Sequence, residues 1–176
     1  CSGLVGSEMC IRDRLKPMQP EHKALFNEHI TSLPKTTKLI FRLCVEAGLR
    51  IDEAIHFPAH DIGNANYSGL DTVPIKITHT KGSKERTVEI PIELYEELEV
   101  HKESHTQLKN LNNRNDLIQA GNKMDIVAYL FLSNKGVPYS ANTLETHFSN
   151  LRKQIREVDS SWSVSYTHLR AHETAT

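Results

Sequence analysis

The sequence predicts an α+β fold that is mainly helical, with a small antiparallel sheet (a β-hairpin plus a short strand) packed against helices. Apolar residues recur every three or four positions in 36–47, which is typical of a helix with one buried face. Apolar and polar residues alternate in 73–77 and again in 88–90, on either side of a Lys-Gly-Ser-Lys turn, which predicts the hairpin. A further apolar stripe at helical spacing in 144–151 predicts a helix late in the chain.

The first two helices are predicted from their apolar spacing and from their ends. Residues 20–33 carry apolar side chains at helical spacing, and Pro34 separates this helix from the next one. In the second helix the stripe formed by 39–47 predicts a buried face, and Gly48 supplies a C-terminal stop.

A third helix is predicted to begin at Ile51. Asp52 and Glu53 lie in its first turn, where negative charge suits the helix dipole, and Pro58 closes it. Arg50 therefore lies in the elbow between two helices. Because two rigid elements hold such an elbow, it is a good place from which to aim a guanidinium group.

The later elements are predicted in the same way. Gly82 is expected at the hairpin tip, where the turn directs Lys81 and Lys84 into solvent or toward a partner. Pro91 is expected to begin a helix. The remaining predictions are a helix end plus loop in 101–123, a short strand in 128–133 and a last helix capped by Ser140.

The two ends of the chain can be back-translated as reverse complements of each other, codon against codon. The pairing fails only further in, where Leu15 faces Trp162. Both ends also look like translations of a sequencing-library adapter read in its two orientations. We therefore expect 1–14 and 163–176 to be non-native, adapter-derived segments and 15–162 to be the native part.

Composition leaves the function open. The chain has 21 Lys and Arg against 22 Asp and Glu, a net charge of −1, and removing the two ends takes three residues from each count. An even balance neither indicates nor excludes a nucleic-acid partner, because binding requires a local basic surface. Cys44 is the one cysteine of 15–162, so no disulfide framework is expected. No apolar stretch approaches the ~20 residues of a membrane helix. We expect a cytoplasmic protein with no membrane partner.

Three stretches, 47–62, 78–92 and 129–151, resemble in their order and spacing the catalytic domain of tyrosine recombinases, the phage-integrase family. The first looks like the family's first box, a Gly-Leu-Arg elbow followed by an acidic residue and a helix. The second resembles its β2–β3 turn, and the third resembles the stretch before its second box. The resemblance covers 15–162, which we interpret as a partial catalytic domain.

The resemblance implies a role for each matching residue. Arg50 would clamp the scissile phosphate, and Glu53 would help hold the elbow. Lys81 would be the general acid that protonates the departing 5′ oxygen, while Lys84 and Arg86 would contact DNA phosphates. These residue types suit the chemistry, because the planar arginine fork donates paired charge-assisted hydrogen bonds and a lysine can give up a proton. No metal and no cofactor are required.

The resemblance also implies a DNA reaction through a covalent 3′-phosphotyrosine, carried out by a tetramer on double-stranded DNA without a small-molecule substrate. The family's second box and its nucleophilic tyrosine would lie beyond Trp162. Tyr139 comes too early and Tyr166 lies in the adapter-like end, so we expect no nucleophile in this chain and an inactive fragment.

Two other classes stay open. One is a non-catalytic DNA-binding module of the same fold, and the other is an unrelated helical protein-interaction domain. A metal protein is not expected. His56 and His60 are four apart, as are His101 and His105, but Pro58 interrupts the first pair and the second does not match the zinc-protease pattern.

Overall fold

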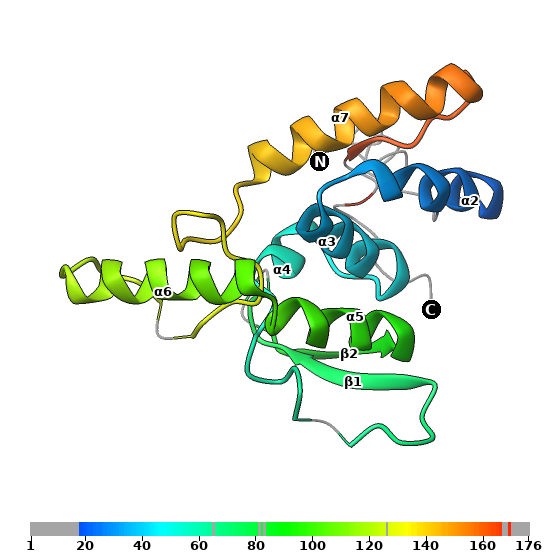
Figure 1. The fold of residues 1–176 in the computed structure, drawn as a ribbon. Helices are drawn as coiled ribbons and strands as arrows, with labels where there is room; N and C mark the ends of the chain where they lie inside the picture. The colour runs from blue at the N-terminus through cyan, green and yellow to red at the C-terminus, as the bar shows by residue number, and fades with distance from the viewer. Residues whose placement is uncertain are drawn as a thin grey trace, which may run out of the picture.

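The computed structural model describes residues 18–64, 66–80, 82, 84–125, 127–166 and 169. Figure 1 shows helices around a central α3, with a two-stranded hairpin below them, which confirms the mainly helical α+β fold. The expected N-terminal segment 1–14 lies outside the described residues. The elements are α2 (Pro20–His29), η1 (Ile30–Ser32), α3 (Lys35–Glu46), α4 (Ile51–Ile55), β1 (Thr72–Ile77), β2 (Arg86–Pro91), α5 (Ile92–Lys102), α6 (His105–Gln119) and α7 (Ala141–Val158).

Helix α3 is the centre of the core. Its predicted stripe is confirmed, since Leu39, Leu43 and Cys44 are fully buried. The helix ends where Gly48 takes a φ of 67°, and the Leu49 N–H then donates to the Leu43 carbonyl at 3.3 Å. A glycine with a positive φ just beyond the C-cap is a common way for a helix to end. It sets the direction in which the chain leaves toward α4.

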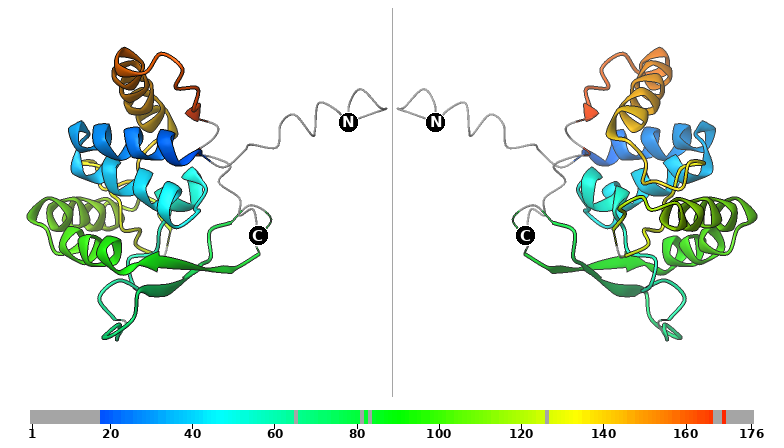
Figure 2. Two further views of the ribbon diagram at one scale, coloured as in Figure 1. Left: turned by 90° about the vertical axis from the view of Figure 1, so that its right-hand side faces the viewer. Right: turned by 90° about the vertical axis from the view of Figure 1, so that its left-hand side faces the viewer.

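Helices α2 and α7 lie side by side over one side of α3 (Figures 1 and 2). Aromatic rings connect the three helices. The ring of Phe41 on α3 meets Phe26 on α2 at 6.4 Å and Phe148 on α7 at 6.0 Å between centroids. Trp162, just after α7, packs on Phe148 at 6.1 Å. Because α7 is capped by the Ser140 hydroxyl, which accepts from the Thr143 N–H at 3.2 Å, its predicted start is confirmed.

The hairpin buries one face and exposes the other. Val73 pairs with Ile90 and Ile75 pairs with Val88 in an antiparallel register, and all four side chains are buried. Helix α5 contacts both strands, and α3 contacts β2. The connection between the strands contains Gly82 with a φ of 87°, as predicted for the tip.

The predicted short strand in 128–133 does not join the hairpin. The structure instead forms isolated bridges, from Tyr129 to Pro58 and from Leu132 to Pro138. The Leu130 N–H donates to the Phe57 carbonyl at 2.8 Å. Three consecutive apolar side chains are buried here, so the segment is enclosed on both faces and pairs with whichever loops surround it.

The prediction of a loop in 101–123 is wrong over most of its length. Helix α6 runs from His105 to Gln119, and its N-terminus is capped by Ser104. Its buried face is polar, which is why apolar spacing did not reveal it. The Asn110 amide donates to the Leu132 carbonyl at 2.9 Å, and the Arg114 guanidinium donates to the Asp125 carbonyl at 2.6 Å. Side chains thus satisfy the carbonyls of an irregular segment that has no sheet partner among the described residues.

The described part of the C-terminal end packs on the core. Val164 and Leu169 are buried, and the Tyr166 hydroxyl donates to the Ala141 carbonyl at 3.3 Å. The inferred adapter origin of 163–176 stays a prediction. Within the part of the chain that the structure describes, no helix combines the length and the apolar character needed to cross a membrane.

His101 gives the fold a pH dependence that can be measured. Its side chain is 4% exposed, and burial, with a smaller contribution from Lys35, lowers its pKa from 6.5 to about 4. Between these values the unfolded chain binds a proton that the folded chain does not, so the free energy of unfolding falls as pH falls. We expect the free energy of unfolding to fall by about 3 kcal/mol between pH 6.5 and pH 4 because of His101. Above pH 6.5 we expect no effect of this group.

Urea unfolding of the wild type and His101→Gln at pH 7 and pH 5 checks this. The wild type should lose about 2 kcal/mol more than the variant over that interval. Equal losses in the two proteins would show that His101 is protonated in the folded state as readily as in the unfolded one.

Candidate functional site

The elbow after α3 positions Arg50. Leu49 is fully buried, and Arg50 follows it as the N-cap of α4 with extended backbone angles. The Arg50 N–H donates to Glu53 Oε2 at 2.9 Å, so the third residue of the helix closes back on the cap. The Arg50 side chain is 29% exposed, with Nη1 3.6 Å from Glu53 Oε1. Its backbone is therefore fixed, and its side chain is partly exposed.

Glu53 is a buried carboxylate at the centre of this arrangement. It is 1% exposed, and besides the Arg50 N–H it receives a hydrogen bond from Arg86 Nη2 at 2.6 Å. The same Arg86 nitrogen donates to the Gly48 carbonyl at 3.0 Å. The pKa of the nearby Cys44 thiol is raised, chiefly by burial and further by the charge of Glu53. Glu53 and Arg86 together thus join the end of α3, the start of α4 and the start of β2.

Arg86 was predicted to contact DNA phosphates, and that role stays a prediction. In the structure its Nη2 contacts both Glu53 and the Gly48 carbonyl, and the side chain is 30% exposed. These contacts give Arg86 a positioning role, since it ties the first residue of β2 to the elbow that carries Arg50.

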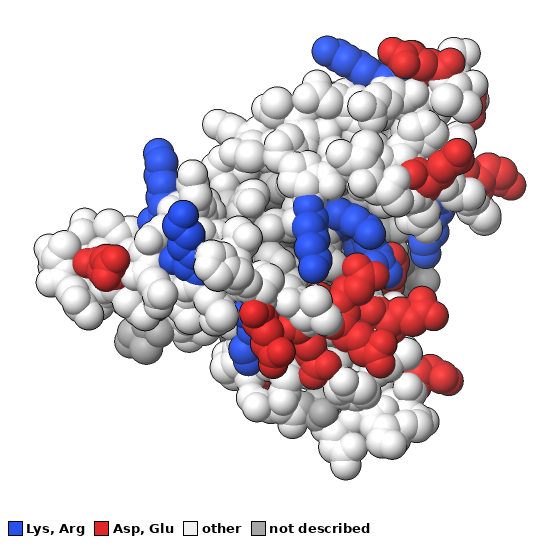
Figure 3. Space-filling view, viewed as in Figure 1, with Lys and Arg blue, Asp and Glu red and all other residues white. Residues whose placement is uncertain are grey.

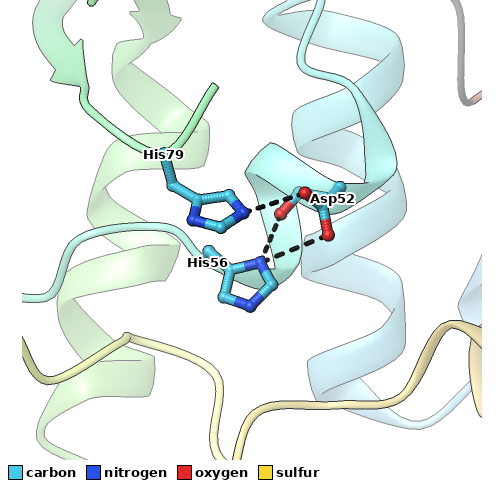
Figure 4. A group of neighbouring side chains, drawn as sticks. All are labelled: Asp52, His56 and His79. Atoms are coloured by element: carbon cyan, nitrogen blue, oxygen red, sulfur yellow. Dashed lines mark hydrogen bonds and ion pairs between the residues drawn. The ribbon is translucent and has the colours of Figure 1, made fainter. Parts of the chain in front are cut away.

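A second connection joins the hairpin to α4. It is made at the β1 end of the loop between the two strands, whereas Arg86 lies at the β2 end. His79 Nε2 lies 2.9 Å from Asp52 Oδ2, and His56 Nδ1 lies 3.4 Å from Asp52 Oδ1 (Figure 4). The His56 and His79 rings stack with centroids 3.9 Å apart. Sequence reasoning missed this group because it compared His56 with His60, its neighbour four residues on. His60 is instead directed to Asp61, at 3.2 Å.

The loop between these two connections contains the predicted lysines. Lys81 lies outside the described residues, so its catalytic role stays a prediction. Two of its described neighbours are hydrogen-bonded to each other, because the Thr80 hydroxyl donates to the Lys84 carbonyl. Lys84 itself is exposed. The two ends of segment 80–85 are therefore held to α4, one through His79 and the other through Arg86.

The charge on the surface is uneven. Figure 3 shows acidic side chains gathered over α5, where Glu93 and Glu96 are exposed. Like charges there would repel a polyanion such as DNA.

The Glu53–Arg86 pair predicts a measurable stability effect. We expect Glu53→Ala to lower the free energy of unfolding by about 2–3 kcal/mol, because it leaves Arg86 and the Arg50 N–H without this acceptor. The figure lies below that of a fully buried pair, since water reaches the part-exposed Arg86. Urea unfolding measures it, with the exposed Glu157→Ala as matched control, expected within about 0.5 kcal/mol of wild type. Equal effects of the two substitutions would contradict the assignment.

Comparison with known families fits this geometry. The structure holds the Arg50 backbone at the start of α4, and the described ends of the loop between β1 and β2 are held to the same helix. The phage integrase family model matches residues 18–174, and the chain therefore belongs to the phage integrase family, as a tyrosine recombinase catalytic domain. Members of this family carry out site-specific DNA recombination. Searches of curated proteins and of solved structures gave no match. The matched range includes 163–174, part of the end predicted to be non-native.

Proposed function

We propose that this chain supplies the phosphate-binding and proton-donating part of an enzyme that cuts and rejoins double-stranded DNA through a 3′-phosphotyrosine. The observation that carries the proposal is the double connection of segment 80–85 to α4. Asp52 receives His79 on one side of the loop, and Glu53 receives Arg86 on the other. Both ends of the loop that contains Lys81 are thereby held to the helix that Arg50 caps.

Arg50 and Lys81 have different roles in the proposed cleavage of the phosphodiester. A tyrosine of the complete enzyme gives its phenolic proton to a general base, and its oxygen attacks the scissile phosphorus and forms a P–O bond, while the bond from phosphorus to the 5′ oxygen breaks. Arg50 stabilises the added negative charge on the non-bridging oxygens, which needs a group that stays protonated. Lys81 transfers its proton to the departing 5′ oxygen. The reverse reaction, with the 5′ hydroxyl of another duplex, rejoins the strand without a high-energy cofactor.

The nucleophile belongs to the complete enzyme in this proposal. Tyr166, the tyrosine nearest the C-terminal end, has its hydroxyl bonded to the Ala141 carbonyl and lies in the segment predicted to be non-native. The complete enzyme would act as a tetramer on DNA, and the present chain alone would bind DNA without cleaving it.

The proposal is tested by changing the leaving group, the 5′ oxygen that Lys81 would protonate. In the complete enzyme, Lys81→Ala should slow formation of the covalent protein–DNA complex on a nicked substrate by about 10²–10⁴-fold, the usual contribution of a general acid. A substrate with sulfur in place of the scissile 5′ oxygen should restore most of the rate, because a thiolate leaves without protonation. Lys84→Ala is the matched control and should show no such rescue.

Each other outcome has a clear meaning. If sulfur fails to restore the Lys81→Ala rate, Lys81 is not the general acid. If the complete protein binds DNA with salt-sensitive affinity but never forms a covalent complex, the non-catalytic DNA-binding module is correct instead. If it has no salt-sensitive affinity for DNA, the proposed function is wrong.

A further inference from the structure

We propose that Asp52, His56 and His79 bind a divalent transition-metal ion of the zinc class. The three side chains converge from two separate elements, α4 with the residue after it and the segment after β1 (Figure 4). One ligand atom from each lies within 4.8 Å of the others. The inference does not depend on the recombination chemistry, because it concerns groups outside the Arg50–Glu53–Arg86 contacts.

The donor set favours a particular class of ion. Two imidazoles and one carboxylate are typical of zinc and of neighbouring transition metals, whereas calcium and magnesium prefer oxygen ligands alone. Three protein ligands leave a fourth position for water, as in zinc sites that are not purely structural. Asp52 is the single carboxylate of the group, so a divalent ion would not be fully neutralised.

The observed distances are close to those that an ion requires. Ligand atoms bound to one zinc ion at about 2.1 Å lie about 3.4 Å apart in a tetrahedron. His79 Nε2 is 2.9 Å and His56 Nδ1 is 3.4 Å from the Asp52 carboxylate oxygens. The stacked rings, 24° from parallel, must tilt so that their lone pairs converge. The Asp52 and His79 side chains are 66% and 40% exposed, which leaves room for that adjustment.

One neighbouring group shields the site, and another competes for one of its ligand atoms. The Tyr129 ring approaches His56 edge-on, with centroids 4.9 Å apart, and limits the side from which an ion can enter. His56 Nδ1 also lies 2.8 Å from the Asp52 carbonyl oxygen, to which it donates a hydrogen bond. This N–H must lose its proton, and the hydrogen bond must break, before that nitrogen can bind an ion. A bound ion would join α4 to the hairpin loop with coordination bonds in place of one hydrogen bond.

The experiment is titration of the chain with Co²⁺ and then Zn²⁺, followed by visible absorbance and calorimetry. Cys1 and Cys10 are first changed to serine in every protein, because thiolates bind these ions strongly. We expect one ion per chain. His79→Ala, His56→Ala and Asp52→Asn should each weaken binding at least about tenfold, since even outer-shell partners of a metal contribute that much. His60→Ala is the matched control and should bind as the parent does.

A second readout separates lost ligands from lost folding. Zinc should raise the Tm of the parent and of His60→Ala but not that of His79→Ala, while circular dichroism without zinc should be the same for all three. The proposal is overturned if His79→Ala and Asp52→Asn bind the ion like the parent, if no ion binds at millimolar concentration, or if Mg²⁺ competes equally with zinc. Because no DNA is present, these results are independent of the test of Lys81.

Discussion

Arg50→Ala in the complete enzyme is expected to lower the rate of covalent complex formation with DNA by about 10²–10³-fold, the range seen when one preorganised charge-stabilising donor is removed. The structure explains why the loss should be in the chemical step. Glu53 fixes the Arg50 backbone at 2.9 Å, and the side chain is 29% exposed at the elbow, where a phosphate can reach it. Its planar fork matches two phosphate oxygens at once. Single-turnover cleavage of a nicked duplex measures the effect.

Arg50→Lys is the more informative variant. It keeps the positive charge but loses the paired donors, so we expect most of the rate loss to remain while DNA affinity is nearly unchanged. Lys84→Ala is the opposite case. It should reduce the dependence of affinity on salt by about one phosphate contact and leave the cleavage rate at saturation unchanged. Full activity in Arg50→Lys would show that only the charge matters.

Gly136→Ala should lower the free energy of unfolding by about 3 kcal/mol. A Cβ at this position would lie 2.4 Å from the Arg114 backbone nitrogen, closer than side-chain carbons approach backbone atoms. Gly136 also has a φ of 76°, which costs other residues about 1–2 kcal/mol, and overpacking adds about 1–3 kcal/mol. The turn that carries Gly136 would have to move away from α6.

Gly121→Ala separates the two contributions. Gly121 has a φ of 86°, but nothing in the described chain lies within 4 Å of the place that a Cβ would take, so only the backbone strain applies. We expect about 1 kcal/mol for this control by urea unfolding. If Gly136→Ala costs no more than Gly121→Ala, the close packing of the turn on α6 is contradicted.

The sequence predicted those elements whose burial follows a simple period. Three local predictions are confirmed: the buried stripe of α3, the helix stop at Gly48, and the alternating burial at Val73 and Ile75. Helix α6 was not predicted, because Asn110 and Arg114 occupy buried positions that apolar residues fill in the other helices. Its stability depends on carbonyls of a distant segment, which no local period can show.

The site was predictable to the same extent. The elbow around Arg50 and Glu53 is local, and the resemblance to a known family identified it. Arg86 was placed on the correct element, but its contact with Glu53 joins residues 33 apart in sequence. The meeting of His79 with Asp52, 27 apart, depends on how the hairpin lies against α4. Such contacts follow from tertiary packing, and single-sequence patterns do not contain them.

Asp52 and Glu53 are consecutive residues, yet each holds a different end of the loop. Any rotation of α4 therefore displaces both ends of 80–85 together, and the backbone of Arg50 with them. Arg50 and the described ends of the loop are thereby coupled through one short helix, which begins just after the glycine at the end of α3. In the proposed reaction, a change in the tilt of α4 would therefore move Arg50 and both ends of the loop that contains Lys81 together.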